Sequence, residues 1–240
     1  MGQLMSQQNK LHRIYITTTL SINLEIVINN DIENHIKNVL RIRDNEEIIV
    51  FNGNGKEFLG AVKYKKNTSI VIKKENRELK HNTNKIILAQ CIPSYKYMDL
   101  AVQKSVELNV DEIIPIISNR SHPGNHEKKE EHWKKIIIHA VEQSNGLFIP
   151  ILNKTLTLDS LLEKFKNTDA YKICFHMSGR KFKKEDKSSS SHLILIGPEG
   201  GFSNNEINII EKYNWNIITL GDRILRTETA AIVAQSLLRY

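Results

Sequence analysis

Two stretches near the carboxyl end decide how this chain folds: Ile194-Leu-Ile-Gly-Pro-Glu-Gly-Gly201 and Leu220-Gly-Asp-Arg-Ile-Leu-Arg-Thr-Glu-Thr-Ala230. Each stretch is typical of an apolar strand that runs into a sharp loop and then into a helix. Corners of this kind are where open α/β sheets bind their ligands. Two such corners close together in the chain predict one composite pocket.

The first corner, Gly197-Pro-Glu-Gly-Gly201, lets a ligand approach the main chain closely because its glycines carry no Cβ. The capping box Ser203-Asn-Asn-Glu206 follows it and predicts a well-defined helix start with free N–H groups. The spacing fits neither the dinucleotide motif nor the P-loop, which excludes those two readings. Taken alone, the corner is also compatible with a tight turn that binds nothing.

The second corner carries Arg226 just before the last helix, where the helix dipole disfavours a cation by roughly 0.3–1 kcal/mol. Either Glu228 or Glu199 compensates this charge, or the site uses it. The last helix also has a small-residue face, formed by Ala230, Ala231 and Ala234. Such a face suits tight packing against the sheet or against a second subunit.

The composition is that of an ordinary globular protein, with 240 residues of which 40% are hydrophobic and 25% charged. No apolar run is long enough to span a bilayer, and Met1–Lys10 lacks the apolar core of a signal peptide. Cys91 and Cys174 lie inside apolar runs and are typical of buried thiols in a reducing cytoplasm. We therefore expect a cytoplasmic protein with no membrane partner.

The net charge of +7 is compatible with an anionic partner such as RNA. Positive charge is denser in the first third, where residues 1–80 hold 13 Lys and Arg against 9 Asp and Glu. A generic solvated surface accounts for this excess equally well, so charge alone does not decide between the two readings.

The first seventy-odd residues predict a small β-barrel, which we assign to residues 1–76. Its expected strands are Arg13–Thr17, Glu47–Phe51, Glu57–Val62 and Ser69–Ile72. Phe51-Asn-Gly-Asn-Gly55 predicts a hairpin because Asn and Gly tolerate positive φ. One short helix is expected around Asp31–Leu40 from the spacing of its apolar residues.

Residues 77–84 are polar and unpatterned, and we take them as a linker to a second domain at 85–240. Strands and helices alternate in that domain, which predicts a largely parallel sheet covered on both faces. Pro115 lacks an N–H and suggests an edge strand or a strand end. Lys181–Ser191 is charged and then Ser-rich, and is expected to be a mobile loop. His122 and His126 have no third ligand at useful spacing, so no metal site is expected.

With both corners in view, the chain resembles the 16S ribosomal RNA uracil-N3 methyltransferases of the SPOUT superfamily, the ribosomal small subunit methyltransferase E family. The two corner motifs are long and specific, and the likeness covers nearly the whole chain. Further matching segments are His35-Ile-Lys-Asn-Val-Leu-Arg41, Phe51–Gly55, Met98-Asp-Leu-Ala-Val-Gln-Lys-Ser-Val-Glu-Leu108, Asn119-Arg-Ser121 and Glu142-Gln-Ser144. In one departure, the family commonly has an Arg near the position of Gly146 or Leu147, which this chain lacks.

The resemblance implies an α/β protein, α+β overall. It implies a PUA-like RNA-binding barrel followed by a SPOUT methyltransferase domain with a C-terminal trefoil knot. It further implies a homodimer that acts on 16S rRNA of the small ribosomal subunit. The implied cofactor is S-adenosylmethionine, released as S-adenosylhomocysteine, with no metal. Carried over by position, the cofactor-binding residues are Phe175, His176, Gly197, Pro198, Glu199, Gly200, Gly201, Leu220, Gly221, Ile224, Leu225 and Arg226.

For the chemistry, we expect Arg226 to stabilise negative charge that develops on the uracil ring, and Glu199, or a water it orients, to accept the N3 proton. Phosphate contacts are expected from the first domain, at Arg13, Lys37, Arg41 and Arg43. Two alternatives stay open. One is a non-catalytic RNA-binding or ribosome-assembly factor on the same fold, and the other is a SPOUT methyltransferase that acts on another RNA position.

Overall fold

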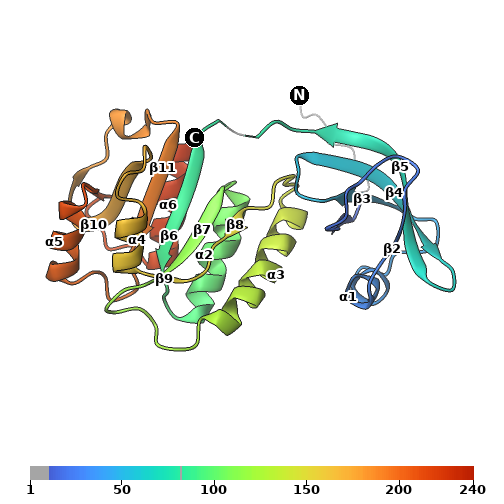
Figure 1. The fold of residues 1–240 in the computed structure, drawn as a ribbon, viewed down its shortest axis with the longest axis horizontal. Coiled ribbons are helices and arrows are strands. Elements are labelled where there is room, and N and C mark those ends of the chain that lie inside the picture. The colour runs from blue at the N-terminus through green and yellow to red at the C-terminus, as the bar shows by residue number, and fades with distance from the viewer. Residues whose placement is uncertain (1–10, 82) are drawn as a thin grey trace, which may run out of the picture. The chain divides into compact units, whose positions relative to one another are not determined.

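The computed structural model describes residues 11–81 and 83–240, and they form two compact units (Figure 1). Unit 1 contains the described residues up to His81 and also the short segment Asn145–Phe148. Unit 2 contains the remaining described residues, 83–144 and 149–240. The first unit is thus built from two separate pieces of sequence, which the sequence analysis does not predict.

Unit 1 is a five-stranded mixed sheet in the order β1-β3-β4-β5-β2. A buried cluster of mostly β-branched residues, with Ile36, Ile48, Ile70 and Ile72 fully covered, forms its core. The short helix α1 (Asn30–Asn34) continues into a π-helical turn at His35–Val39. The strands are β1 (Arg13–Tyr15), β2 (Glu25–Val27), β3 (Glu47–Phe51), β4 (Lys56–Tyr64) and β5 (Thr68–Glu78).

The expected hairpin at Phe51–Gly55 is confirmed, because β3 and β4 pair antiparallel across it and Gly53 and Gly55 both have positive φ. The strand β2 is not predicted from the sequence, because it has only three residues, of which Ile26 alone is buried, and so it shows no clear strand pattern. The strand β5 is longer than expected and runs through Arg77 and Glu78, which we had placed in the linker. Pairing with Lys56 and Glu57 of β4 keeps these polar residues in the sheet.

The segment Asn145–Phe148 is held in unit 1 by two arginines. Arg13 donates to the Gly146 carbonyl at 2.7 Å, and Arg77 donates to the Asn145 carbonyl at 2.9 Å. The Gly55 N–H adds a bond of 3.1 Å to the Leu147 carbonyl. The segment that lacks the family's usual arginine therefore receives arginine contacts from β1 and β5.

Unit 2 is a seven-stranded sheet in which all pairs are parallel, in the order β12-β10-β11-β6-β7-β8, with the short β9 also on β7. The strands are β6 (Lys85–Cys91), β7 (Glu112–Ile117), β8 (Ile151–Leu152), β9 (Leu156–Thr157), β10 (Tyr171–Lys181), β11 (Ser191–Ile196) and β12 (Asn216–Thr219). The helices are α2 (Tyr95–Glu107), α3 (Glu127–Gln143), α4 (Leu158–Lys164), α5 (Asn204–Lys212) and α6 (Thr227–Arg239). The parallel sheet predicted from the alternation of strands and helices is confirmed.

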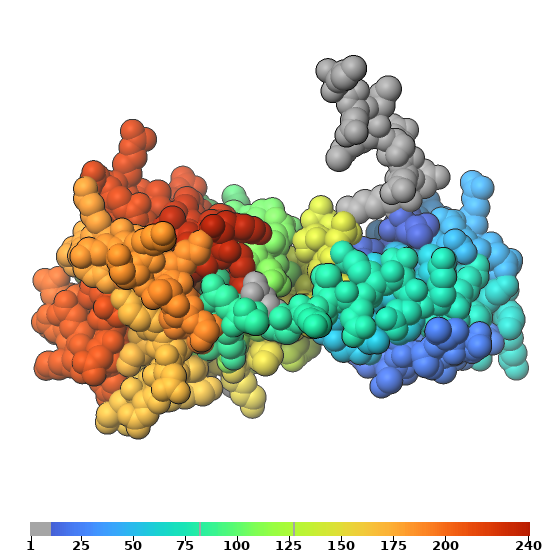
Figure 2. Space-filling view, turned by 90° about the horizontal axis from the view of Figure 1, so that it is seen from above, coloured from blue at the N-terminus to red at the C-terminus, as the bar shows by residue number. Residues whose placement is uncertain are grey.

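Helices cover both faces of this sheet (Figure 1). The odd residues of β6, such as Ile87 and Ala89, pack in one apolar cluster with Leu161 of α4 and Ile210 of α5. The opposite face carries α6, which packs on β6, β11 and α2. In Figure 2 the red C-terminal residues lie against the teal and green residues of β6 and α2. The small residues Ala231 and Ala234 are fully buried, so this part of the small-residue face packs within the chain.

The edge-strand reading of Pro115 is wrong, because β7 pairs on both sides. Pro115 aligns with Gln90 of β6, and on the other side β8 pairs with Glu112 and Ile113 while β9 pairs with Ile116 and Ile117. The proline thus falls in the gap between two short partner strands, where the ladder needs no N–H donor from it.

Within the described residues, no helix is long and apolar enough to cross a membrane. The trefoil knot implied by the resemblance stays a prediction.

Candidate functional site

The first corner forms as the sequence predicts. The strand β11 ends at Ile196, the loop Gly197–Gly201 follows, and α5 begins after Ser203. The capping box is present: the Ser203 N–H donates to the Glu206 carboxylate at 2.7 Å, and the Glu206 N–H donates to the Ser203 hydroxyl at 3.3 Å. Gly201 has φ of +64°, and a Cβ built on it would meet no atom within 4 Å.

The second corner runs from the end of β12 at Thr219 through Leu220–Arg226 into α6. Its turn begins at Gly221, whose φ of +126° is a backbone conformation that few residues other than glycine adopt. The Thr219 hydroxyl donates to the Gly221 carbonyl at 2.9 Å and closes the turn. The helix α6 then starts with Thr227 and Glu228, both about 95% buried.

One buried chain of hydrogen bonds ties the two corners together. The Gln90 amide at the end of β6 donates to the Thr227 hydroxyl at 2.8 Å, and this hydroxyl donates to the Gly197 carbonyl at 2.6 Å. Gln90 is fully buried, so its bond to Thr227 forms away from competing water, and the bond from Thr227 to Gly197 is partly buried. They fix the start of α6 against the loop that follows β11.

The corners enclose one cavity of about 610 Å³, a size typical of small-molecule sites. The helix α2 contributes Tyr97 to its wall. The remaining residues come from the middle of β10, from the ends of β11 and β12 with the loops that follow them, and from the start of α6. The lining residues are Tyr97, Phe175, His176, Met177, Ile196–Phe202, Thr219, Leu220, Arg223–Glu228 and Ala230.

The residues expected to bind a cofactor line this cavity, with the exception of Gly221. Gly221 shapes the turn behind Leu220 instead of forming the wall. The sequence alone does not predict Tyr97, Met177 or Arg223 as site residues, and it suggests Glu228 only as a partner for Arg226. The helical spacing around Tyr97 marks an amphipathic helix, and no pattern in the sequence shows that its first turn meets the carboxyl end of the sheet.

Glu199 is firmly held in its loop. Its carboxylate accepts the Ser94 N–H at 3.1 Å and the Ser94 hydroxyl at 2.9 Å. Burial alone would raise the pKa of Glu199, but these hydrogen bonds outweigh burial and hold the pKa below its ordinary value. The carboxylate is therefore ionised at neutral pH, and its hydrogen bonds to Ser94 make it less able to accept a proton.

Arg226 is exposed at the mouth of the second corner, with its guanidinium 5.8 Å from the centre of the Tyr97 ring. Among the described residues it forms no ion pair with Glu199 or Glu228. One of the two explanations for the Arg226 charge was compensation by a neighbouring carboxylate, and the structure shows no ion pair of that kind among the described residues. The charge is available to a bound ligand.

The strand β10 places His176 and Met177 at the cavity through an irregular stretch. Pairing of β10 with β12 shifts register between Phe175 and Arg180, so residues 176–179 bulge out of the ladder. Gly179 permits this because a Cβ there would lie 2.5 Å from the backbone nitrogen of Ile218. The His176 ring accepts the Ser178 N–H at Nδ1 (3.3 Å), and burial lowers the pKa of His176.

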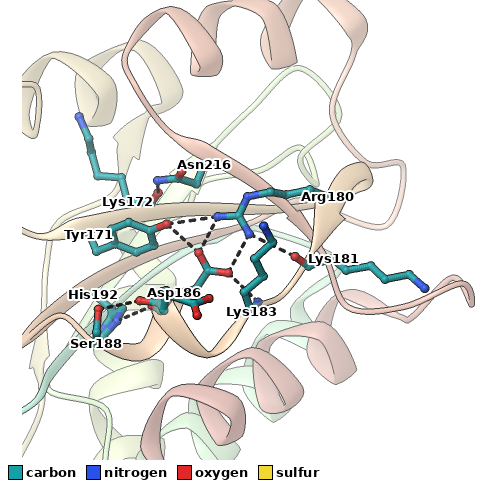
Figure 3. Close-up of polar contacts among 10 residues, drawn as sticks. Tyr171, Lys172, Arg180, Lys181, Lys183, Asp186, Ser188, His192 and Asn216 are labelled. Carbon is teal, nitrogen blue, oxygen red and sulfur yellow. Dashed lines mark hydrogen bonds and ion pairs between the residues drawn. The ribbon is translucent and has the colours of Figure 1, made fainter.

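The expectation that Lys181–Ser191 is a mobile loop is not supported, since hydrogen bonds anchor this segment on Asp186 (Figure 3). The Asp186 carboxylate, almost fully buried, accepts two bonds from Arg180 at 2.5 and 2.8 Å and one from the Tyr171 hydroxyl at 2.7 Å. Its carbonyl bonds the buried His192 ring at 3.0 Å. Arg180 and Tyr171 both belong to β10, so the segment braces the strand that carries the bulge.

The four expected phosphate contacts differ in accessibility. Arg13 is buried, paired with Glu57 and stacked 4.8 Å from the Phe51 ring, so its guanidinium is not available to phosphate. Lys37 is exposed but forms an ion pair with Glu33. Arg41 and Arg43 are exposed, and their guanidinium groups form no ion pair within the described residues. We therefore exclude Arg13 from the RNA-contact set.

The described part of the chain holds no group of three or more metal-binding side chains. The Tyr95 ring lies edge-on to the rings of both His122 and His126, at 4.9 and 6.0 Å between centroids. Cys91 and Cys174 are fully buried free thiols, and burial raises the pKa of Cys91 above that of an ordinary thiol.

Two family models match the chain, the RNA methyltransferase domain at residues 80–239 and the RNA methyltransferase PUA domain at residues 28–75. Ribosomal RNA small subunit methyltransferase E of Mesomycoplasma hyopneumoniae is 38% identical over 86% of this chain and 90% of the relative. The enzyme of the same name from Rickettsia conorii is 33% identical over 94% of this chain and 93% of its own length.

The chain belongs to the ribosomal RNA small subunit methyltransferase E family.

Solved structures of this family share the fold. A ribosomal RNA small subunit methyltransferase E from Neisseria gonorrhoeae, bound to S-adenosyl methionine, superposes with a TM-score of 0.88 at 31% identity, over 95% of this chain and 96% of that one. A putative methyltransferase from Legionella pneumophila, solved with the same cofactor, gives a TM-score of 0.89 at 31% identity and the same coverage.

The Asp186 contacts predict a pH-dependent contribution to stability. The hydrogen bonds from Arg180 lower the pKa of Asp186 below its ordinary value, against the opposing effect of burial, and Tyr171 adds to the lowering. Because the pKa of Asp186 is lower in the folded than in the unfolded state, its ionised carboxylate stabilises the fold above the unfolded-state pKa of about 4. This stabilisation is lost progressively as pH falls from there toward the lower, folded-state pKa. We expect Asp186→Asn to lower the free energy of unfolding at pH 7 by roughly 1–3 kcal/mol, and this difference to shrink below pH 4.

Glu185→Gln is the matched control, because Glu185 is exposed and adjacent in sequence. Chemical denaturation followed by circular dichroism at pH 7 and near pH 3 measures both variants. An equal loss of stability at the two pH values would show that the ionised carboxylate is not what stabilises this segment.

Proposed function

We propose that this protein methylates N3 of a uridine in 16S ribosomal RNA of the small subunit, with S-adenosylmethionine as methyl donor. The observation that carries the proposal is the meeting of the two corners around one cavity in a member of this family. Relatives that align over most of the chain are named for ribosomal RNA methylation, and two structural neighbours were solved with this cofactor. The substrate RNA places this activity in the cytoplasm.

The residues present fit the cofactor. The cavity has the volume of a small-molecule site, and the open space at Gly201, where a Cβ would meet no atom within 4 Å, allows close approach of a ligand. We assign cofactor binding chiefly to the backbone of Gly197–Gly201 and Leu220–Leu225, with Phe175 and His176 on the wall. When bound, S-adenosylmethionine supplies a methyl group on a positively charged sulfur and leaves as S-adenosylhomocysteine.

Uracil N3 carries a proton at neutral pH, so the site must favour the deprotonated ring. We assign to Arg226 the stabilisation of negative charge on the uracil oxygens, because its guanidinium lies at the cavity without an ion pair. The Tyr97 ring beside it offers a flat apolar surface to a base that has left its stack. Alignment of the nucleophile with the methyl group lowers the entropy cost of the reaction.

We further propose that unit 1 binds the RNA backbone through Arg41 and Arg43, with a smaller contribution from Lys37, and that the protein works as a homodimer. Ile224 beside the cavity is 87% exposed, and Leu237 on α6 is 38% exposed. The exposed apolar side chains of Ile224 and Leu237 are compatible with burial against a second copy of this chain. Sedimentation at micromolar concentration gives the mass, and a monomer there would contradict the homodimer.

The function is tested with small ribosomal subunits from a strain that lacks this gene. Incubation with the protein and S-adenosylmethionine is expected to produce 3-methyluridine in 16S rRNA, detected by mass spectrometry of the nuclease digest. RNA binding without cofactor binding would support the non-catalytic assembly factor instead. A methyl group found on ribose or on another RNA would support the alternative methyltransferase.

Gly201→Trp is expected to abolish cofactor binding in calorimetry, because the ring would occupy the cavity. Gly201→Ala is the control, since it carries the same strain from positive φ without the bulk. If the tryptophan variant and the wild type bind S-adenosylmethionine with equal affinity, the cofactor does not bind at this corner.

Arg226→Ala is expected to lower kcat by about 100-fold or more while the Kd for S-adenosylmethionine changes little, because the proposed contact forms as charge develops on uracil. Lys212→Ala is the control, because Lys212 is an exposed cation on α5 and does not line the cavity. The reverse pattern, weak cofactor binding with unchanged kcat, would make Arg226 a cofactor ligand.

Arg41→Ala and Arg43→Ala are each expected to weaken RNA binding and to reduce the salt slope of the binding constant by about 1, as loss of one phosphate contact does. Lys74→Ala, an exposed lysine of β5, is the control. Filter binding of a 16S rRNA fragment across salt concentrations measures the slopes. Identical slopes for the wild type and both arginine variants would refute these contacts.

A further inference from the structure

Glu228 is a buried carboxylate on the cavity wall. It lies in the first turn of α6, is only 5% exposed and lines the cavity between the two corners. Its Oε2 is buried and has no hydrogen-bond partner among residues 11–81 and 83–240. Of the described residues that line the cavity, Glu228 alone has a buried side-chain polar atom without a partner.

The unpartnered Oε2 atom of Glu228 indicates that a ligand supplies its hydrogen-bond donor. Leaving a buried acceptor unsatisfied costs roughly 1–3 kcal/mol, and more when the group is charged, so native proteins keep few of them. The position of Glu228 is not the result of a loosely held helix, since Thr227 beside it bonds both Gln90 and the Gly197 carbonyl. A donor supplied by a molecule in the cavity would complete the site.

Two other side-chain acceptors on the wall, those of Glu199 and His176, are already engaged. The Glu199 carboxylate accepts two bonds from Ser94. His176 accepts the Ser178 N–H at Nδ1, which leaves the ring proton on Nε2 and makes that nitrogen a donor. Glu228 thus differs from both, because its Oε2 has no hydrogen-bond partner among the described residues.

We propose, on the basis of the function proposed above, that Glu228 is the catalytic residue that accepts the N3 proton of uracil. N3 loses its proton to the Glu228 carboxylate, and the N3 lone pair forms the new bond to the methyl carbon. The electrons of the broken carbon–sulfur bond stay on sulfur, which becomes neutral. The proton then passes from Glu228 to solvent, so charge and atoms balance. This assigns to Glu228 the role that the sequence analysis gave to Glu199.

The charges around Glu228 suit this role. The titratable and charged groups that share the cavity with it are Tyr97 on α2, His176 on β10, Glu199 after β11, and Arg223 and Arg226 before α6. Arg226 stabilises the ring oxygens of the deprotonated base while Glu228 removes the proton. The proposed acceptor in the first turn of α6 and the stabilising cation at its N-cap are therefore only two residues apart in sequence.

The experiment compares Glu228→Gln and Glu228→Ala with the wild type, and uses Glu211→Gln on α5 as the matched control, since Glu211 is exposed. Circular dichroism and calorimetric binding of S-adenosylmethionine verify that the variants fold and keep the cofactor site. We expect Glu228→Gln to bind the cofactor as the wild type does and to lower kcat by about 100-fold or more, the contribution of a general base.

Two further measurements separate proton acceptance from a structural role. The deficit of Glu228→Gln should shrink as pH rises, and also with RNA that carries 5-fluorouridine at the target, because N3 of that base ionises more readily. With S-adenosylhomocysteine bound, the wild type and Glu228→Gln should prefer uridine RNA over 3-methyluridine RNA, which lacks the N3 proton. Glu228→Ala should lose this preference.

A deficit that is the same at every pH and with both RNAs would overturn the proposal, as would unchanged kcat in Glu228→Gln. Cofactor affinity that falls in step with kcat would make Glu228 a cofactor ligand and also overturn it. A wild-type protein that binds no S-adenosylmethionine and methylates no RNA would instead refute the proposed function itself.

Discussion

The site depends on one buried chain of hydrogen bonds, from the Gln90 amide through the Thr227 hydroxyl to the Gly197 carbonyl. It joins three segments that are far apart in sequence: the end of β6, the loop after β11 and the start of α6. Without it, the relative position of the two glycine-containing loops would depend more heavily on apolar packing. A hydrogen bond is directional, so it fixes their register in a way that apolar contact does not.

Polar groups around the cavity divide into those that build it and those left for a ligand. Ser94 holds Glu199, Arg120 donates to the Gly200 carbonyl at 2.7 Å, and Ser178 orients His176. Within the part of the chain that the structure describes, Arg226 and the Oε2 atom of Glu228 have no such partner. Preorganised donors and acceptors with nothing to satisfy them inside the protein are what a site for charge redistribution requires.

The wall formed by β10 depends on the Asp186 contacts. A bulge in a strand is disfavoured unless neighbouring structure holds it, because it interrupts the ladder of hydrogen bonds. Arg180 lies immediately after the bulge and Tyr171 at the start of the strand, and Asp186 binds both. The charged segment between β10 and β11 thus stabilises the bulged strand β10, although its composition is typical of a solvated loop.

The sequence predicted the elements whose cause is local. The hairpin at Phe51–Gly55 depends on residues that accept positive φ, and the start of α5 depends on the capping pair Ser203 and Glu206. The alternation of strands and helices predicted the parallel sheet, because each element carries its own period of apolar residues. The two corner motifs predicted most of the cavity wall, since parallel strands bring their carboxyl ends to one edge.

Contacts between distant residues were beyond the sequence. Nothing local distinguishes Arg13, buried against Glu57, from the exposed Arg43, so both appeared as phosphate contacts. Asp186 lay in a charged and Ser-rich run, and only the folded chain brings Arg180 and Tyr171 to it. Glu228 looked like a helix-dipole partner for Arg226 until its burial and its unpaired oxygen were seen. Sequence determined which segments form strands, corners and helices, whereas tertiary structure alone decided which charges are used inside the protein and which are free, because pairing and burial are properties of neighbours in space.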